Sequence, residues 1–141
     1  MKELGTINRE ISRVISHQGH GDLLMVVDAG FPIPSNLDVI DISLGENNPM
    51  VVDILDEMNK FFSVEKMILA NQTRSTNPFF FKKITACFGN NVEIETIDHQ
   101  ELKEMSKQVK AIIRSGDFTA YGNVILVSGA GNRWYSEKNQ G

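Results

Sequence analysis

Continuous apolar runs of strand length recur along the chain and alternate with segments of helical spacing. Four runs are apolar at every position, which is typical of strands buried on both faces of a sheet. They cover residues 23–27, 67–70, 111–113 and 124–127. Residues 92–97 alternate apolar and polar side chains, and residues 37–42 do so over part of their length. The pattern predicts six short strands, of which 92–97 has one solvated face.

The segments between these runs carry apolar residues at helical spacing. The first helix is predicted over residues 8–16, with Asn8 as its cap. Asn48-Pro49 and Asn77-Pro78 each place a capping residue before a proline, and they predict helices that continue to about residue 62 and about residue 89. Asp98 stands three residues before Glu101, which is the spacing of a capping box and predicts a helix to about residue 108.

Alternating helices and strands indicate the α/β class, as a single compact domain with a mostly parallel sheet flanked by helices. We expect this domain to cover residues 1–128. The polar stretch 71–77 is predicted to close the strand at residues 67–70. Residues 129–141 are polar and rich in glycine and asparagine, which predicts a frayed C-terminal tail.

Polar side chains stand at both ends of the first apolar run. His20 precedes it between two glycines, and Asp28 follows it in front of Ala29-Gly30. In open α/β sheets, ligand sites form at the ends of strands. Pro32 and Pro34 stiffen the chain after Asp28, because each proline fixes its own φ and restricts the residue before it. The run 23–27 and its two flanks are therefore the first place to look for a site.

Composition narrows the possible partners. A formal charge of −4 and scattered basic residues argue against a nucleic acid or an anionic membrane as partner. Cys87 is the single cysteine, so an intrachain disulfide is excluded and a reducing compartment, the cytoplasm, is expected. The first residues include an early acid and lead into no long apolar segment, so we expect no signal peptide.

Each candidate for chemistry also has a plain structural interpretation. His20 could move protons near neutral pH, or it could be a loop histidine without a task. Asp28 could orient a sugar hydroxyl or hold His20 in one tautomer, and it could equally form an Asx turn. His99 could face a site or only solvate a helix start. The run Tyr121-Gly122-Asn123 offers a phenol, a close backbone and an amide to a polar ligand, although such loops are also ordinary turns.

Several other sites are not supported. Gly19-His20-Gly21 and Gly129-Ala130-Gly131 lack the Lys-Ser/Thr of a phosphate loop. His17 and His20 are three residues apart, but glycine interrupts the helix and no acidic ligand is spaced with them, so no metal site is predicted. The triplet 79–81 is all phenylalanine without interleaved basic residues, which favours core and interface surface over a nucleic-acid platform.

Six motifs taken together resemble the D-ribose pyranase family, whose close relatives are the fucose mutarotases. Their order and spacing match the family from about residue 4 to residue 128. The motifs are Gly19-His20-Gly21-Asp22, Asp28-Ala29-Gly30-Phe31-Pro32-Ile33-Pro34, Asn77-Pro78, His99-Gln100-Glu101-Leu102-Lys103, Ile113-Arg114-Ser115-Gly116-Asp117 and Tyr121-Gly122-Asn123. The chain departs from the family in its charged C-terminal extension and in Asn71-Gln72, where members often carry an acidic pair.

The resemblance implies a function and an assembly. Members of the family exchange the pyranose and furanose forms of a sugar without a cofactor, in a ring-shaped homodecamer with sites between neighbouring subunits. Carried across by motif, His20 becomes the general acid, and Asp28, His99, Tyr121, Gly122 and Asn123 become sugar-binding residues. The predicted partners are a monosaccharide, most simply D-ribose, and further copies of the chain.

Three functions follow as hypotheses. The first is an isomerase that opens and closes the ring of ribose by acid and base catalysis. The second is a sugar-binding module without catalysis, which would need hydrogen bonds at His20 but no titrating proton donor. The third is a mutarotase for another sugar such as fucose.

Overall fold

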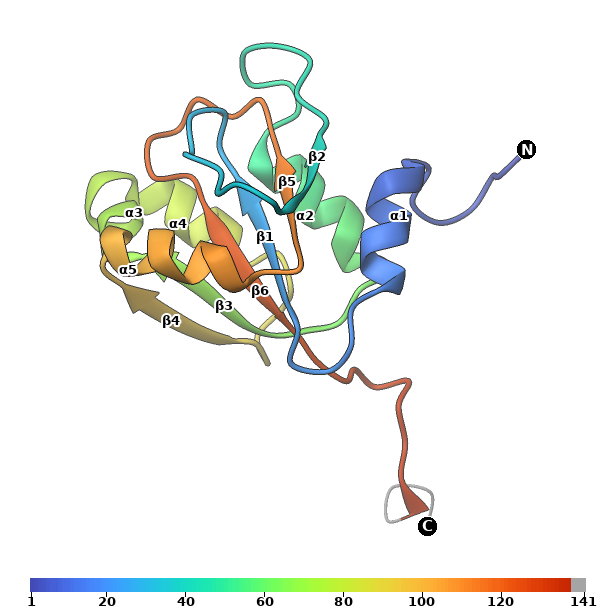
Figure 1. Cartoon of the computed structure of the whole chain (residues 1–141). Helices are drawn as coiled ribbons and strands as arrows, with labels where there is room; N and C mark the ends of the chain where they lie inside the picture. The colour runs from blue at the N-terminus through green and yellow to red at the C-terminus, as the bar shows by residue number, and fades with distance from the viewer. Residues whose placement is uncertain (138–141) are drawn as a thin grey trace.

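Six strands form one sheet at the centre of the protein (Figure 1). The computed structural model describes residues 1–137. The strands are β1 (Leu23–Val27), β2 (Asp38–Asp41), β3 (Val64–Ala70), β4 (Glu93–Ile97), β5 (Ala111–Arg114) and β6 (Val124–Ser128). Their order across the sheet is β2-β5-β1-β6-β3-β4.

Strand direction decides which loops meet. β1 pairs in parallel with β5, β5 with β2, and β3 with β4, whereas β6 lies antiparallel between β1 and β3. Five strands therefore finish at one end of the sheet, here called the carboxyl end, and β6 starts there. The opposite end is called the amino end. The prediction of an α/β domain with a mostly parallel sheet is confirmed.

Helices cover both faces of the sheet. The helices are α1 (Arg9–Ser16), α2 (Val51–Asn59), α3 (Asn71–Thr76), α4 (Pro78–Thr85) and α5 (His99–Met105), with a short 3-10 helix at Ser106–Gln108. Apolar residues of α1, α2 and α4 pack with Leu24 and Val26 on one face. Leu102 of α5 and Phe31 pack with Met25 and Val27 on the other face. Successive residues of β1 thus enter opposite core layers, as expected for a strand buried on both sides.

Three predicted helix starts hold and one is wrong. α4 begins at Pro78 after its N-cap Asn77, as the sequence predicted. The side chain of Asn8 accepts from two N–H groups of α1, and Asp98 accepts from Gln100 N at the start of α5. Asn48-Pro49, however, does not start α2. Asn48 forms a β-bridge with Gly45 in a tight loop, and the peptide bond between Asn48 and Pro49 is cis. The helix begins at Val51, after Met50. Here the local cap signal gives way to contacts with the loop after β5, since Gly116 N donates to Pro49 O.

The polar segment that closes β3 forms a helix that the sequence analysis did not predict. α3 follows Ala70 without a loop, and Thr73 in its middle is fully buried. The polar residues of this segment gave no apolar periodicity, which is why the sequence pattern missed it. Its side chains instead bond to loops at the carboxyl end.

Beyond β6 the chain leaves the body of the protein (Figure 1). Trp134 in this segment is 74% exposed. Residues 138–141 of the predicted tail lie outside the described residues. Across the described part of the chain, no helix is both long and apolar enough to cross a membrane.

Candidate active site

Most of the predicted site residues meet at the carboxyl end of the sheet. Asp28 follows β1, His99 opens α5 after β4, and Tyr121 and Asn123 precede β6. All four line one pocket of about 350 Å³. They converge because β6 runs against its neighbours, so its start lies beside the finish of β1 and β3.

Asp28 is the most constrained member of this group and is 9% exposed. Its Oδ1 accepts from Gly30 N at 3.0 Å, which is the Asx turn that the sequence allowed, and its Oδ2 accepts from Gly122 N at 3.0 Å. Its own N–H donates to Asn123 Oδ1 at 2.9 Å. Burial raises the pKa of the Asp28 carboxyl above its usual value, while the N–H donors act in the opposite direction.

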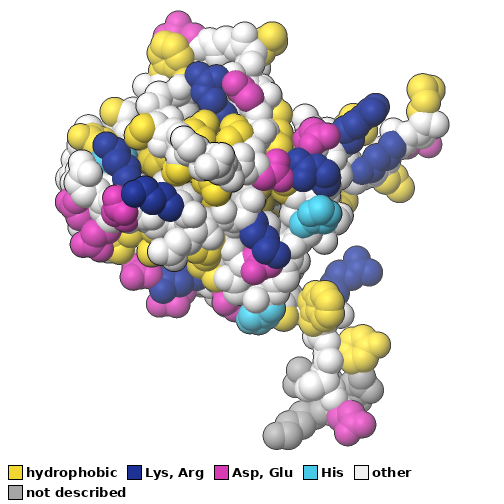
Figure 2. Space-filling view, in the orientation of Figure 1, with side chains coloured by type: hydrophobic (Ala, Val, Ile, Leu, Met, Phe, Trp, Pro, Cys, Tyr) yellow, Lys and Arg dark blue, Asp and Glu magenta, His cyan; other side chains and the backbone are white. Residues whose placement is uncertain are grey.

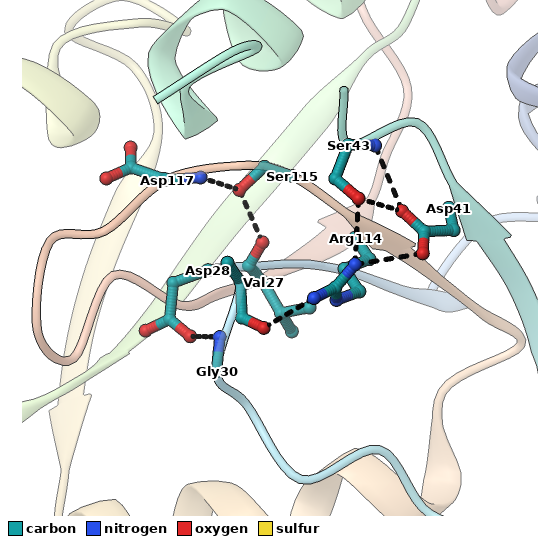
Figure 3. Close-up of polar contacts among 9 residues, drawn as sticks. Val27, Asp28, Gly30, Asp41, Ser43, Arg114, Ser115 and Asp117 are labelled. Carbon is teal, nitrogen blue, oxygen red and sulfur yellow. Dashed lines mark hydrogen bonds and ion pairs between the residues drawn. The ribbon is translucent and has the colours of Figure 1, made fainter. Parts of the chain in front are cut away.

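Side chains from neighbouring strands fix the turn that carries Asp28 (Figure 3). The Arg114 guanidinium donates to Ala29 O at 2.9 Å and also to Asp41 and Ser43, which ties this turn to β5 and β2. Ser115 Oγ donates to Val27 O at 2.7 Å, one residue before Asp28. The rigid path predicted from the prolines therefore rests on this network as well.

His99 and Tyr121 form the aromatic side of the pocket. Their ring centroids are 5.0 Å apart at an interplanar angle of 83°, and Phe31 stands edge-on to His99 at 6.4 Å. Tyr121 has a left-handed backbone with φ of 58°. Within the described residues, the buried Nδ1 of His99 has no hydrogen-bond partner.

Gly122 acts through its backbone and its lack of a side chain. A Cβ at this position would lie 2.8 Å from Thr119 O and 3.4 Å from the Asp28 Cβ. Only glycine allows the chain to approach this closely and to donate from Gly122 N to the Asp28 carboxylate.

His20 lies at the amino end, away from the other predicted site residues. It sits in the turn before β1, and its Nε2 is 3.3 Å from Glu65 Oε2 at the start of β3. The five residues of β1, at about 3.3 Å each, separate the two ends by roughly 16 Å. The interpretation in which Asp28 orients His20 within one chain is therefore wrong. His20 instead lines a second pocket, of about 300 Å³, with Gly129 and Trp134.

Phe31 and Lys103 also line the pocket, but neither was predicted as a site residue. Phe31 covers one side of His99, and Lys103 lies one helical turn after His99 on α5. The i, i+4 spacing of Lys103 could have indicated it. Phe31 had no such signal, because its contact with His99 depends on how α5 packs on the sheet. Among the described residues, no three His, Cys, Asp or Glu side chains cluster as a metal site would need.

We expect the imidazole of His99 to titrate below the ordinary histidine pKa of 6.5. Burial lowers the pKa of His99 first, and the charge of Lys103 lowers it further. As the pH falls below 6.5, an unfolded chain takes up this proton before the native chain does, so His99 makes the fold less stable on the acid side. Histidine-selective NMR across pH 4.5 to 8 would measure the midpoint. Lys103→Gln should move it upward, and a native midpoint at or above 6.5 would contradict the expectation.

Comparison with known proteins gives a consistent result. The model of the RbsD / FucU transport protein family matches residues 1–131. The chain is 45% identical over 129 residues to a D-ribose pyranase of Lactobacillus johnsonii, with 92% of this chain and 98% of that protein covered. It is 36% identical over 141 residues to a D-ribose pyranase of Pseudothermotoga lettingae, with 100% and 99% covered.

Solved structures agree with this match. The structure of Bacillus subtilis RbsD complexed with D-ribose is 35% identical, superposes with a TM-score of 0.88 and covers 92% of this chain and 98% of that one. The fucose mutarotase of Streptococcus pneumoniae in complex with L-fucose is 20% identical with a TM-score of 0.73, covering 93% and 99%. The second likeness shows the fold alone.

Proposed function

Because the chain belongs to the RbsD / FucU transport protein family, we propose that its carboxyl-end pocket binds D-ribose and that the protein exchanges the pyranose and furanose forms of this sugar. The chain is an isomerase of the D-ribose pyranase type. One observation carries the choice of ligand. The pocket joins a buried carboxylate that is already hydrogen-bonded, two amphipathic rings and an amide, which suits a small neutral polyol.

Ring exchange needs two proton movements. A proton must reach the ring oxygen and another must leave the anomeric hydroxyl, and closure onto a different hydroxyl repeats the exchange in reverse. We assign the first movement to the imidazole of His20. Asp28, His99 and Tyr121, which line the carboxyl-end pocket, hold the hydroxyls.

The two halves of this site lie at opposite ends of one chain, so we propose that they meet between subunits. Both ends carry exposed aromatic side chains, Phe118 at the carboxyl end and Phe61 at the amino end. If the amino end of one copy contacts the carboxyl end of the next around a closed ring, both aromatic side chains become buried. The same contact would bring His20 of one copy to Asp28 of the next. Figure 2 also shows hydrophobic side chains grouped on the face of the protein that is turned toward the viewer. We propose a homodecamer, as the family resemblance implies, located in the cytoplasm.

Saturation-transfer NMR on a panel of monosaccharides tests the proposed reaction directly. We expect the protein to accelerate exchange between the pyranose and furanose signals of D-ribose, in a buffer with a chelator and no nucleotide. If the protein accelerated the exchange of fucose but not of ribose, the substrate would be fucose. Binding of ribose with exchange no faster than in buffer would leave a sugar-binding module and overturn the isomerase.

A further inference from the structure

Helix α3 contacts both sides of the carboxyl-end pocket through side chains that do not line it. This short polar helix runs from Asn71 to Thr76. Its residues reach toward two loops that are distant in sequence, the start of α5 near residue 98 and the loop 119–122. Those two loops carry His99 and Tyr121, the aromatic side of the pocket.

Gln72 secures the segment that carries His99. Its Nε2 donates to Asp98 Oδ1 at 3.0 Å, and its Oε1 accepts from His99 N at 3.0 Å. The other carboxylate oxygen of Asp98 accepts from Gln100 N. The bond from Gln72 lowers the pKa of Asp98, which keeps this cap charged at the helix start. Both groups of the Gln72 amide are thus used to fix where α5 begins.

Thr73 secures the segment that carries Tyr121. The residue is 0% exposed, and its Oγ1 donates to Tyr121 O at 2.6 Å. One residue earlier, Ala120 O accepts from Asn77 Nδ2 at 2.7 Å. A tyrosine adopts the left-handed backbone conformation only where neighbouring contacts stabilise it. These two hydrogen bonds fix the carbonyl groups of Ala120 and Tyr121 and so stabilise this conformation.

We propose that Gln72 and Thr73 are positioning residues for sugar binding, because they are adjacent on one helix and hold the backbones of His99 and Tyr121 respectively. Together they set the edge-to-face contact of the two rings, whose centroids are 5.0 Å apart and which line one side of the pocket. The inference rests on the proposed function for its consequence in catalysis. Its structural part, the placement of the two rings, is measurable without any sugar.

The test for Thr73 uses two substitutions at one position. Thr73→Val keeps the branched shape and removes the hydroxyl, so the Tyr121 carbonyl loses its donor. We expect KM for ribose exchange to rise about tenfold, with a smaller change in kcat, because a buried hydrogen bond to the site is lost. Thr73→Ser keeps the hydroxyl and should stay within about twofold of the unaltered protein.

Ser75→Ala is the matched control. It removes a hydroxyl from the same helix, but Ser75 is exposed and bonds only to Gln72 O at 3.4 Å. We expect its KM to be unchanged. A KM for Thr73→Val equal to that of Ser75→Ala would overturn the positioning role of Thr73.

NMR of the His99 ring separates this inference from the proposed function. Gln72→Leu and Thr73→Val should each shift the His99 ring signals, because the nearby Tyr121 ring moves relative to them, and Ser75→Ala should not. If the unaltered protein exchanges no ribose, the proposed function fails while these shifts still report the placement of the rings. Ring signals that stay unchanged in both Gln72→Leu and Thr73→Val would overturn the inference itself.

Discussion

His20→Ala is expected to lower the rate of ribose ring exchange by about 10² to 10⁴-fold, the usual contribution of a positioned general acid. The imidazole of His20 is the proton donor that we propose at the amino-end half of the site, and alanine cannot transfer a proton. The measurement is the saturation-transfer exchange rate at saturating ribose. Because the substitution removes chemistry and leaves the carboxyl-end pocket intact, we expect the apparent affinity for ribose to change far less than the rate.

The fold should tolerate this substitution. The side chain of His20 is 67% exposed and its polar contact is with the exposed Glu65, so its loss should cost no more than about 0.5 kcal/mol of unfolding free energy. His17→Ala is the matched control, an exposed histidine three residues away that belongs to α1's C-cap. Full activity in His20→Ala, with the same melting temperature, would remove the general acid from the proposal.

A mixture of two inactive variants is expected to recover activity if sites form between subunits. His20→Ala subunits keep the carboxyl-end half, and Tyr121→Ala subunits keep the amino-end half. With random assembly from equal amounts, each half-site is intact with a probability of one half. About a quarter of the sites then combine two intact halves, for a closed ring of unlike contacts. The measurement is exchange activity after unfolding and refolding the two variants together.

The control mixture combines the unaltered chain with the double variant His20→Ala/Tyr121→Ala. A site between subunits again leaves about a quarter of the sites intact, so both mixtures should have similar activity. A site within one chain would instead give none in the first mixture and about half in the second. That pair of results, in oligomers shown by mass spectrometry to contain both variants, would contradict a shared site.

The elements of the fold were largely predictable from local pattern. The apolar runs identify four of the six strands, since a strand buried on both faces has few polar positions in its sequence. Alternation of apolar and polar residues identifies β4 and, over part of its length, β2. Helix ends were less well predicted. α2 ends at Asn59 and α4 at Thr85, each several residues before the predicted end. Phe62 and Phe88 fit the helical spacing, but each packs against the core beyond the last helical turn, so spacing alone extended the helices too far.

The residue types of the site were also predictable, because the motifs that flank the strands are local. Asp28, His99, Tyr121 and Asn123 were named from sequence and lie around one pocket. Thr73 was not named, and Gln72 was noted only as a departure from the family pattern, without a role in the site. Their partners lie 26 to 48 residues away, and a polar helix held by such distant bonds leaves no periodic signal in its own segment.

Only the tertiary structure decided which of these residues lie together. Periodicity fixes which positions of a strand are buried, but it is the same for both strand directions. The reversed direction of β6 brings Asn123 to Asp28, and no pattern in residues 124–127 records it. His20 and Asp28 are close in sequence and flank one strand, yet an extended strand places its two ends about 3.3 Å apart for every residue between them. Their separation within one chain follows from that geometry.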